Sequence, residues 1–410
     1  MIPDLPAVPE KRLAVRLTPD AFRQLRGGHP WVFDRAIKSV SNASAAPGTL
    51  AVVFDSDRAF AGIGLWDPRS PIRLRVLHAG KPTQIDAAFW EKKVRAALLA
   101  RRPLASTNTT GMRLIHGEND GFGALVVDQY DSTLVVKVYS PAWLPHLNAV
   151  LDVIRKVVEP DRIVLRLGRI AEAATSVLNA GLEDGQVIYG EPVDGPVLFE
   201  EWGRTFEADV IAGQKTGHFL DQRDNRKFIG DSAADARVLD VFSCTGGFSV
   251  HAAAGGATLV HSVDLAAPAI ATAKRNMAHN ADAVSHAIHR TTVGDAFEVM
   301  DQLNQVNEKY DIVVVDPPSF ASRASERDGA MKAYRKLAEL AVQLVAPGGR
   351  LMQASCSSRI TEDDLASTVR AAIASQHRTA TGEERFGHGI DHPITFPQGQ
   401  YLKAITARLT

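Results

Sequence analysis

Residues 237–250 read RVLDVFSCTGGFSV, where an apolar strand ends at Asp240, two glycines follow at 246 and 247, and a helical pattern begins at Phe248. A strand, a glycine-rich turn and a helix in this order let the backbone approach a nucleotide-like ligand closely. The turn lacks the G-x-G-x-x-G pattern that accommodates a pyrophosphate, which disfavours NAD. An acid beside the turn suits a cofactor with a cationic centre and no phosphates, and S-adenosylmethionine is the common example. A generic turn with structural glycines is the alternative that this pattern leaves open.

The same alternation of strand and helix continues to the end of the chain. Further strands are predicted in TLVHSVD (258–264), HRTTVGDA (289–296), YDIVVVD (310–316) and RLMQAS (350–355). Helices are predicted over 267–279, 297–306, 332–344 and 361–375. Such a series predicts a doubly wound α/β domain with a parallel sheet, whose ligands bind at the carboxyl ends of the strands. We therefore expect Asp240, Asp264, Asp295 and Asp316 to lie at one edge of one sheet.

The fourth of these strands ends in a stiff turn, Asp316-Pro317-Pro318-Ser319-Phe320. The two prolines fix the backbone and present Asp316 to the cleft. A carboxyl group can bind the exocyclic amine or ring nitrogen of a nucleobase, and Phe320 could supply a stacking face. The alternative is an ordinary strand-end turn with Phe320 in the core.

The fifth strand runs directly into Cys356. A thiolate that attacks C6 of a pyrimidine turns C5 into a carbon nucleophile, and methylation of an amine or a hydroxyl never needs this step. A reactive thiol requires a lowered pKa or a base, and neither Lys nor His neighbours Cys356 in sequence. The alternative is an inert core residue, which is also our interpretation of Cys244 in the glycine turn.

Composition limits the kind of protein. The chain has 410 residues, of which 45% are hydrophobic and 23% charged, and its formal net charge is −1. These values are typical of a globular protein of two or three domains and exclude collagen-like, coiled-coil and broadly disordered chains. Two cysteines form no disulfide framework or zinc-type spacing, and no apolar run has the length of a membrane span. We expect a cytoplasmic protein with no bound metal and no membrane partner.

The pattern changes along the chain at two places, so we predict three regions: 1–78, 79–195 and 196–410. Short strands broken by glycine and proline fill the first region, whereas a helical period over 89–101 opens a mixed α+β region. Basic residues gather in the first region: Lys11, Arg12, Arg16, Arg23, Arg26, His29, Arg35, Lys38, Arg69, Arg73 and Arg75. Their charge fits a solvated surface as well as a nucleic-acid groove.

Five motifs together resemble the class I 23S rRNA 5-methylcytosine methyltransferases of the RlmI type: GQKTGHFLDQRDNR (213–226), DVFSCTGGFSV (240–250), VVVDPPSF (313–320), ASCSS (354–358) and DHPITFPQGQYLK (391–403). The stretch LTPDAFRQLRGGHPWVFDRAI (17–37) resembles the PUA domain of that family, and MRLIHGENDGFGALVVDQY (112–130) resembles its central domain. The resemblance implies a small β-barrel, PUA-like RNA-binding domain over 1–78 and a central α+β domain over 79–195. A Rossmann-like methyltransferase domain with a mostly parallel seven-stranded sheet is implied over 196–410.

The resemblance also implies roles for single residues. S-adenosylmethionine would be bound by Phe219, Asp221, Arg223, Asp240, Phe242, Ser243, Thr245, Gly246, Gly247, Asp264 and Asp295. Asp316 would hold the target cytosine together with Pro317, Pro318 and Phe320, and Cys356 would be the nucleophile. The base that removes the C5 proton stays open between Asp316, a water that it holds, and His392. The implied partner is RNA, namely large-subunit rRNA, and a homodimer is compatible with the sequence.

Two other functions stay open. Related rRNA methyltransferases share the Q-K-T-G and D-P-P features but methylate purine nitrogens, in which case Cys356 would be a bystander. A non-catalytic RNA-binding factor in ribosome assembly is less favoured, because the acidic strand ends and the cysteine are all present.

Overall fold

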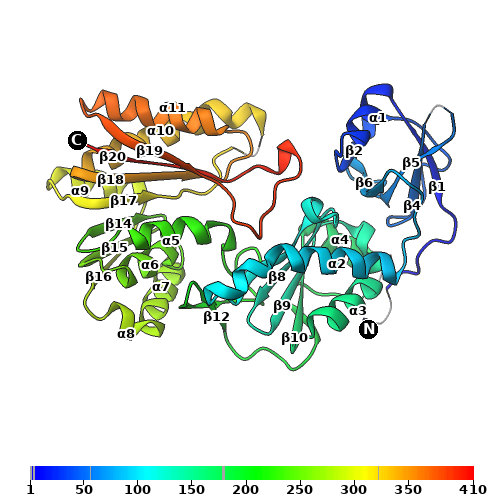
Figure 1. The fold of residues 1–410 in the computed structure, drawn as a ribbon, viewed down its shortest axis with the longest axis horizontal. Coiled ribbons are helices and arrows are strands. Elements are labelled where there is room, and N and C mark those ends of the chain that lie inside the picture. The colour runs from blue at the N-terminus through cyan, green and yellow to red at the C-terminus, as the bar shows by residue number, and fades with distance from the viewer. Residues whose placement is uncertain (1, 3–4, 56, 178–180, 322) are drawn as a thin grey trace. The chain divides into compact units, whose positions relative to one another are not determined.

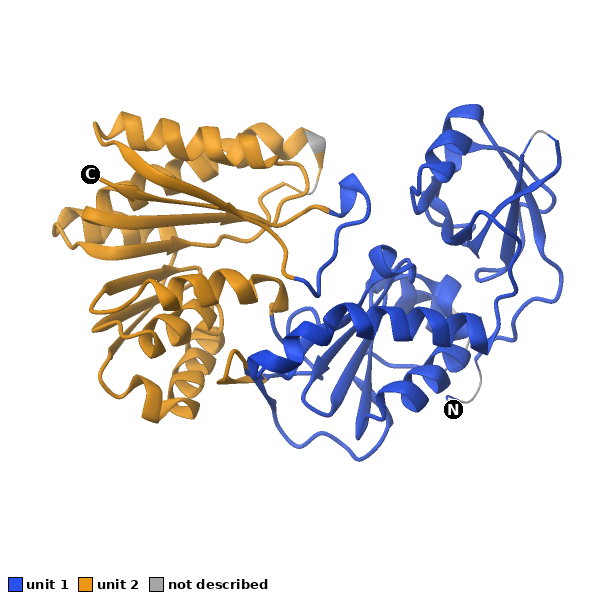
Figure 2. Cartoon of the chain, viewed as in Figure 1, with its two compact units in different colours: residues 1–200, 208–218, 390–399 blue, residues 201–207, 219–389, 400–410 orange. Residues whose placement is uncertain are grey.

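The structure, a computed structural model, describes residues 2, 5–55, 57–177, 181–321 and 323–410. The chain folds into two compact units (Figure 2). Unit 1 comprises Met1–Glu200, Ala208–His218 and Ile390–Gly399, and unit 2 comprises Glu201–Glu207, Phe219–Gly389 and Gln400–Thr410. The chain therefore passes from one unit to the other five times. The domain boundaries expected near residues 78 and 195 stay predictions.

Unit 1 begins with a six-stranded sheet in the order β2-β6-β5-β4-β1-β3 (Figure 1). Its elements are β1 (Leu13–Leu17), α1 (Pro19–Arg26), β2 (Trp31–Phe33), β3 (Ile37–Val40), β4 (Leu50–Phe54), β5 (Phe60–Trp66) and β6 (Ile72–Ala79). The sequence LAVRL of β1 alternates strictly between buried and exposed residues, as expected of a strand with one face on a core. This sheet accounts for the short strands predicted before residue 78.

A second, five-stranded sheet in unit 1 has the order β11-β10-β9-β8-β7. Its strands are β7 (Gly111–His116), β8 (Leu125–Tyr130), β9 (Thr133–Val138), β10 (Arg162–Leu167) and β11 (Gln186–Tyr189), with helices α2 (Ala87–Arg101), α3 (Leu147–Val158) and α4 (Arg169–Val177). Leu50, Ile63 and Leu77 of the first sheet belong to the same buried cluster as Trp90 and Trp143 of this region. One continuous core thus joins both sheets of unit 1.

Two segments from later in the chain return to unit 1. The Thr216 hydroxyl donates to Asp128 at 2.6 Å. The Asp391 carboxylate accepts from the backbone N–H of Arg113 at 3.0 Å, and its carbonyl accepts from buried Arg101 at 3.1 Å. Buried backbone groups need such partners, so these contacts anchor 208–218 and 390–399.

Unit 2 is built on a seven-stranded sheet in the order β16-β15-β14-β17-β18-β20-β19. Its strands are β14 (Arg237–Val241), β15 (Leu259–Asp264), β16 (Ile288–Val293), β17 (Tyr310–Val315), β18 (Val345–Ser355), β19 (Ala380–Phe386) and β20 (Lys403–Leu409). The first five are mutually parallel, and β20 runs antiparallel to both of its neighbours. The Rossmann-like, mostly parallel seven-stranded sheet predicted from the sequence is confirmed. Before this sheet the chain forms a hairpin of β12 (Val197–Glu201) and β13 (Arg204–Ala208).

Two layers of helices cover the sheet. One contains α5 (Arg223–Asp231), α6 (Gly247–Ala254), α7 (Ala267–His279) and α8 (Ala281–Val284), and the other contains α9 (Ala296–Gln305), α10 (Arg327–Leu344) and α11 (Glu362–Ser375). Figure 1 shows α10 and α11 together over β18 and β20. The central strands are buried over residues 312–315 of β17 and 349–355 of β18, as expected for strands covered on both faces. This burial leaves the strand ends as the place for polar chemistry.

Candidate active site

Four carboxylates lie at the carboxyl end of adjacent parallel strands in unit 2. Asp240 is the penultimate residue of β14, Asp264 ends β15, Asp295 follows β16, and Asp316 follows β17. These strands are neighbours in the order β16-β15-β14-β17. The sheet therefore brings all four to one edge, where ligands of doubly wound proteins bind.

The glycine turn after β14 has an unusual backbone. Phe242, Cys244 and Gly246 have φ angles of +63°, +48° and +78°. Left-handed conformations of residues other than glycine are costly and gather at functional sites. Here the backbone N–H of Cys244 donates to Asp264 at 2.8 Å, which holds the turn in place. At Gly247 a Cβ atom would lie 2.6 Å from the side chain of Arg226, so only glycine lets α6 begin at this point.

Asp240 is fully buried behind this turn. One carboxylate oxygen accepts from the backbone N–H of Ser249 at 3.0 Å and from its hydroxyl at 2.6 Å. The other oxygen is buried and has no partner among the described residues, and the same holds for the Ser243 hydroxyl. Burial raises the pKa of Asp240 to about 7. Orphaned polar atoms of this kind are costly unless a ligand supplies the missing partner.

Asp264 and Asp295 are half-buried, and both accept hydrogen bonds from backbone N–H groups. Asp264 accepts from Cys244 and, with its other oxygen, from the backbone N–H of Ala266 at 2.8 Å. Asp295 caps α9 by accepting from the N–H of Phe297 at 2.9 Å. A carboxylate has about four acceptor positions, so each can still accept from a ligand. The cofactor contacts implied for Asp264, Asp295 and the remaining turn residue Thr245 stay predictions.

A buried ion pair fixes the segment that precedes β14. Arg226 of α5 forms a bidentate pair with Glu201 at 2.6 and 2.5 Å, and it donates to the carbonyl of Phe219 at 2.9 Å. Burial alone would raise the pKa of Glu201, but Arg226 and His251 hold it well below its ordinary value. The ion pair thereby positions the turn Leu220–Gln222, which carries Asp221.

Two further predicted cofactor residues lie in this segment. Asp221 is buried, and one of its carboxylate oxygens accepts from the Tyr401 hydroxyl at 2.9 Å. Arg223 begins α5, is also buried, and pairs with Asp224 at 3.1 Å. Phe219 is half-buried. The predicted set therefore lies on three strand ends and on this one segment of unit 2.

The surroundings of Asp316 disfavour its charged form. Burial and the nearby carboxylates of Asp221 and Asp240 raise its pKa to about 7, against the opposing effect of a hydrogen bond with Gln222. Near neutral pH the group can therefore either donate or accept a proton, as acid and base catalysis requires. Pro317 is buried and Pro318 is exposed.

Phe320 makes a contact that its predicted role did not include. Its ring lies 5.1 Å from that of Tyr334 in a tilted arrangement, and it packs against a buried cluster. Phe320 thus packs against the core with part of its surface, as the alternative interpretation of this turn predicts. Stacking of a base on Phe320 stays a prediction.

Cys356 follows β18 between two fully buried serines. The Ser355 hydroxyl donates to the Tyr334 hydroxyl at 2.8 Å, and the Ser357 hydroxyl donates to the carbonyl of Ala321 at 2.7 Å. These bonds fix the backbone on both sides of the thiol, while Cys356 itself is half-buried. Since β17 and β18 are adjacent, Asp316 and Cys356 follow neighbouring strands. The other cysteine, Cys244, has a pKa raised to about 11 by burial and by Asp264, which makes it a poor nucleophile.

Sequence reasoning missed Lys403, the first residue of β20. Its side chain is buried, and its ammonium donates to the carbonyls of Ser357 and of Tyr401, the latter at 2.8 Å. Lys403 is the last residue of the motif 391–403, but nothing in the sequence indicates that β20 inserts beside β18. His392, one of the candidate bases, lies in unit 1, where it pairs with Asp391 at 3.0 Å and packs on the ring of His116.

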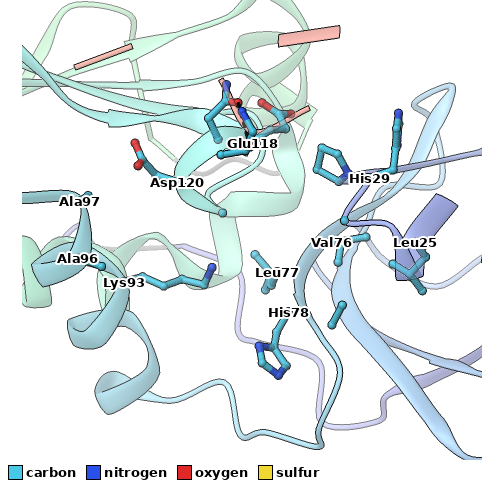
Figure 3. Close-up of a pocket in the computed structure, with 16 residues that line it drawn as sticks. Leu25, His29, Val76, Leu77, His78, Lys93, Ala96, Ala97, Glu118 and Asp120 are labelled. Atoms are coloured by element: carbon cyan, nitrogen blue, oxygen red, sulfur yellow. Dashed lines mark hydrogen bonds between the residues drawn. The ribbon is translucent and has the colours of Figure 1, made fainter. Parts of the chain in front are cut away.

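A separate cavity of about 450 Å³ lies in unit 1 (Figure 3). It is lined from β6, α2 and the turn Gly117–Asp120, and its lining includes His29, His78 and Lys93. Lys93 lies over the rings of Phe89 and Phe122 at 5.3 and 6.0 Å, and burial lowers its pKa to about 8. The acidic sheet edge contributes no residue to it.

No group of three or more His, Cys, Asp or Glu side chains suited to a metal ion occurs in the part of the chain that the structure describes. None of the described helices combines the length and apolarity needed to cross a bilayer.

Comparison with known proteins gives matches along nearly the whole chain. The family described as S-adenosylmethionine-dependent methyltransferase matches residues 182–399, and a PUA-like domain matches residues 15–79. A protein of Deinococcus radiodurans named "Ribosomal RNA large subunit methyltransferase" is 44% identical over 98% of both chains. "Ribosomal RNA large subunit methyltransferase I" of Shewanella frigidimarina is 32% identical over 97% of this chain and 99% of its own.

Solved structures show the same fold. A protein from Streptococcus mutans described as a SAM-dependent methyltransferase superposes with a TM-score of 0.79 at 22% identity, covering 96% of this chain and 99% of its own. A methyltransferase crystallised in complex with SAH superposes with a TM-score of 0.80, also at 22% identity, covering 97% of this chain and 99% of its own.

Proposed function

Because the chain belongs to the S-adenosylmethionine-dependent ribosomal RNA large-subunit methyltransferases, we propose that it methylates C5 of a cytosine in large-subunit rRNA through a covalent adduct with Cys356. The observation that carries this proposal is the pair formed by Cys356 and Asp316 after adjacent strands of unit 2. Methylation of a purine nitrogen would need the carboxyl group but not a thiol.

The residues at the sheet edge fit S-adenosylmethionine. The orphaned oxygen of Asp240 at the end of β14 and the orphaned hydroxyl of Ser243 in the glycine turn are the polar atoms to which a cationic cofactor would supply missing partners. Asp264 and Asp295 offer further acceptors on the adjacent strand ends, and Phe219, Asp221 and Arg223 lie on the segment that the Glu201–Arg226 pair positions. When bound, S-adenosylmethionine supplies the methyl group as an electrophile and leaves as a neutral thioether.

The chain's own residues account for the activation of the target cytosine. The Cys356 thiolate attacks C6, the C6–S bond forms, and the electron pair of the C5–C6 double bond makes C5 nucleophilic. Asp316, with a pKa near 7, donates to or accepts from the polar edge of the cytosine and so fixes its orientation. After the methyl group is attached, loss of the C5 proton to a base expels the thiolate and restores the double bond. Of the candidate bases, Asp316 is the one that shares unit 2 with Cys356.

The decisive experiment follows the product. Labelled S-adenosylmethionine is incubated with the protein and large-subunit rRNA, and the RNA is digested to nucleosides and examined by mass spectrometry. We expect 5-methylcytidine. A methylated purine would instead assign the reaction to a ring nitrogen, and the absence of both product and cofactor binding would favour a non-catalytic RNA-binding factor.

Replacement of the nucleophile tests the covalent step. We expect Cys356→Ala to lower the rate of methyl transfer by at least about 10³-fold, since removing a nucleophile abolishes the covalent pathway. Binding of S-adenosylmethionine, measured by calorimetry, should stay within about threefold and serves as the control for folding. RNA with 5-fluorocytosine should trap an adduct on the unsubstituted protein, because fluorine at C5 cannot leave as a proton. Mild loss of activity in the variant would contradict the mechanism.

A further inference from the structure

Lys403 occupies a position that the proposed mechanism does not yet explain. It is the first residue of β20 and pairs in register with Ser355, the last residue of β18, directly before Cys356. Its side chain is only 2% exposed. Strand pairing thus places a buried lysine beside the backbone that carries the thiol, although the two residues are far apart in sequence.

The surroundings of Lys403 hold its ammonium group at a defined place. Its Nζ atom donates to the carbonyl of Ser357, the residue after Cys356, and to the carbonyl of Tyr401. An ammonium group has three donors, so these two bonds leave one donor to point elsewhere. Of the charged groups around Lys403, Cys356 does most to favour the ammonium form of the lysine, followed by Asp364.

A purely structural role explains this lysine poorly. Burial of an ammonium group is unfavourable unless an opposite charge is close. No side-chain carboxylate forms an ion pair with Lys403 among the residues that the structure describes, and Asp364 already binds Arg327 at 2.6 Å and caps α11. Burial accordingly lowers the pKa of Lys403 to about 8. Ionisable groups in such environments are characteristic of functional sites.

We propose that Lys403 is a positioning residue that holds Cys356 as the thiolate, the form that attacks C6 of the cytosine. This inference rests on the proposed function. Three other titratable groups surround this pair: Tyr334 of α10 interacts with Cys356, Asp364 of α11 interacts with Lys403, and Asp316 after β17 interacts with Tyr334. Each of these is neutral or negative and, when ionised, disfavours a neighbouring thiolate. Lys403 is the cation of the group and has the sign needed to offset them.

The test measures the acidity of the thiol, independently of methyl transfer. The chain has two cysteines, so all proteins carry Cys244→Ala and Cys356 is the thiol that reacts. The rate of carbamidomethylation by iodoacetamide is measured between pH 5.5 and 10. An isolated thiol has a pKa of about 8.5, and we expect the pKa of Cys356 to be at least one unit lower. An inflection at or above 8.5 would overturn the inference without any change at Lys403.

Two variants assign the effect to the lysine charge. Lys403→Met keeps the length of the side chain and should reduce alkylation at pH 7 by about tenfold or more, with the inflection moved up by at least one unit. Lys403→Arg keeps the charge and should largely restore the low inflection. Calorimetric binding of S-adenosylmethionine confirms that each variant is folded. An unchanged profile in Lys403→Met overturns the inference, and so does a profile in Lys403→Arg that matches the Met variant.

The outcomes separate this inference from the proposed function. A thiol that Lys403 acidifies in a protein that makes no 5-methylcytidine would support the inference and refute the proposed product. Formation of 5-methylcytidine with a thiol that ignores Lys403 would do the reverse.

Discussion

At the scale of single residues, Asp240 and Asp316 are two carboxyl groups whose ionised form is disfavoured by the fold, and the pKa of each is about 7. Asp240 and Asp316 keep their protons to higher pH in the folded chain than in the unfolded one, because burial disfavours the charged form. Their contribution to stability is therefore fully present below about pH 4 and is lost as the pH rises through about 7. The site is bought at the expense of stability at neutral pH, a common feature of functional sites.

Asp240→Asn tests this cost. The amide can keep accepting from Ser249 and places its NH₂ where the orphaned oxygen lies. We expect the variant to be more stable than the unsubstituted protein at pH 8 by on the order of 2–4 kcal/mol, with the gain shrinking towards zero near pH 4. Denaturant unfolding at the two pH values measures it, and S-adenosylmethionine affinity should fall at the same time. Equal stability of the two proteins at pH 8 would show that Asp240 carries no such cost.

Residue patterns predicted some of the site and not the rest. Asp264 and Asp316 could be found because each closes a predicted strand, and strand ends of a parallel sheet meet at one edge. Lys403 could not be found in this way, since its contact with the carbonyl of Ser357 depends on a strand pair formed between distant segments. The unusual backbone at Phe242 is likewise invisible in the sequence.

At the scale of elements, helices with clear ends were predicted best. The range 267–279 coincides with α7. By contrast, the helix predicted over 332–344 begins at Arg327, because its first turn is polar and contains a glycine and so has no apolar period. Helix α9 begins one residue earlier than predicted, since Asp295 caps it.

The link between Glu201 at the end of β12 and Arg226 in α5 is an interaction between elements that can be tested. Glu201→Ala leaves a buried guanidinium without its partner, which typically costs about 3–5 kcal/mol. We expect this loss in denaturant unfolding, together with weaker cofactor binding because the carbonyl of Phe219 loses its anchored donor.

A matched control lies in the same helix. Asp231→Ala breaks the exposed pair between Asp231 and Lys227, whose side chains are 61% and 37% exposed. Exposed helix pairs contribute only about 0.3–0.5 kcal/mol. Comparable losses in the two variants would mean that burial does not distinguish these ion pairs.

At the scale of the whole molecule, a net charge of −1 supplies no general attraction for RNA. Binding then depends on local surfaces. Arg23 and Arg26 of α1 are exposed, and so is Arg35 in the helical turn after β2. Arg75, which the sequence groups with them, is instead buried and donates to the carbonyl of Ile72. Only part of the predicted basic cluster is therefore available to a polyanion.

Replacement of Arg23, Arg26 and Arg35 by alanine tests the remaining part. We expect weaker RNA binding and a shallower dependence of log Kd on log salt, by about 0.7–0.9 for each lost phosphate contact. Filter binding over a salt series measures the slope. S-adenosylmethionine affinity should not change, since its proposed residues lie in unit 2. A triple variant with the original slope would show that these arginines are merely solvated.

The five passages of the chain between its two units also set an order in time. Unit 1 needs Asp391, which accepts from Arg113, yet synthesis reaches residues 390–399 only after most of unit 2 has been made. Asp391 lies almost three hundred residues after both of its donors. During synthesis, the backbone N–H of Arg113 and one guanidinium nitrogen of Arg101 therefore lack this partner until that segment has been made. The same late stretch delivers Lys403 to β18. Both units therefore lack contacts until synthesis has passed residue 403, and a chain cut before residue 390 lacks these contacts altogether.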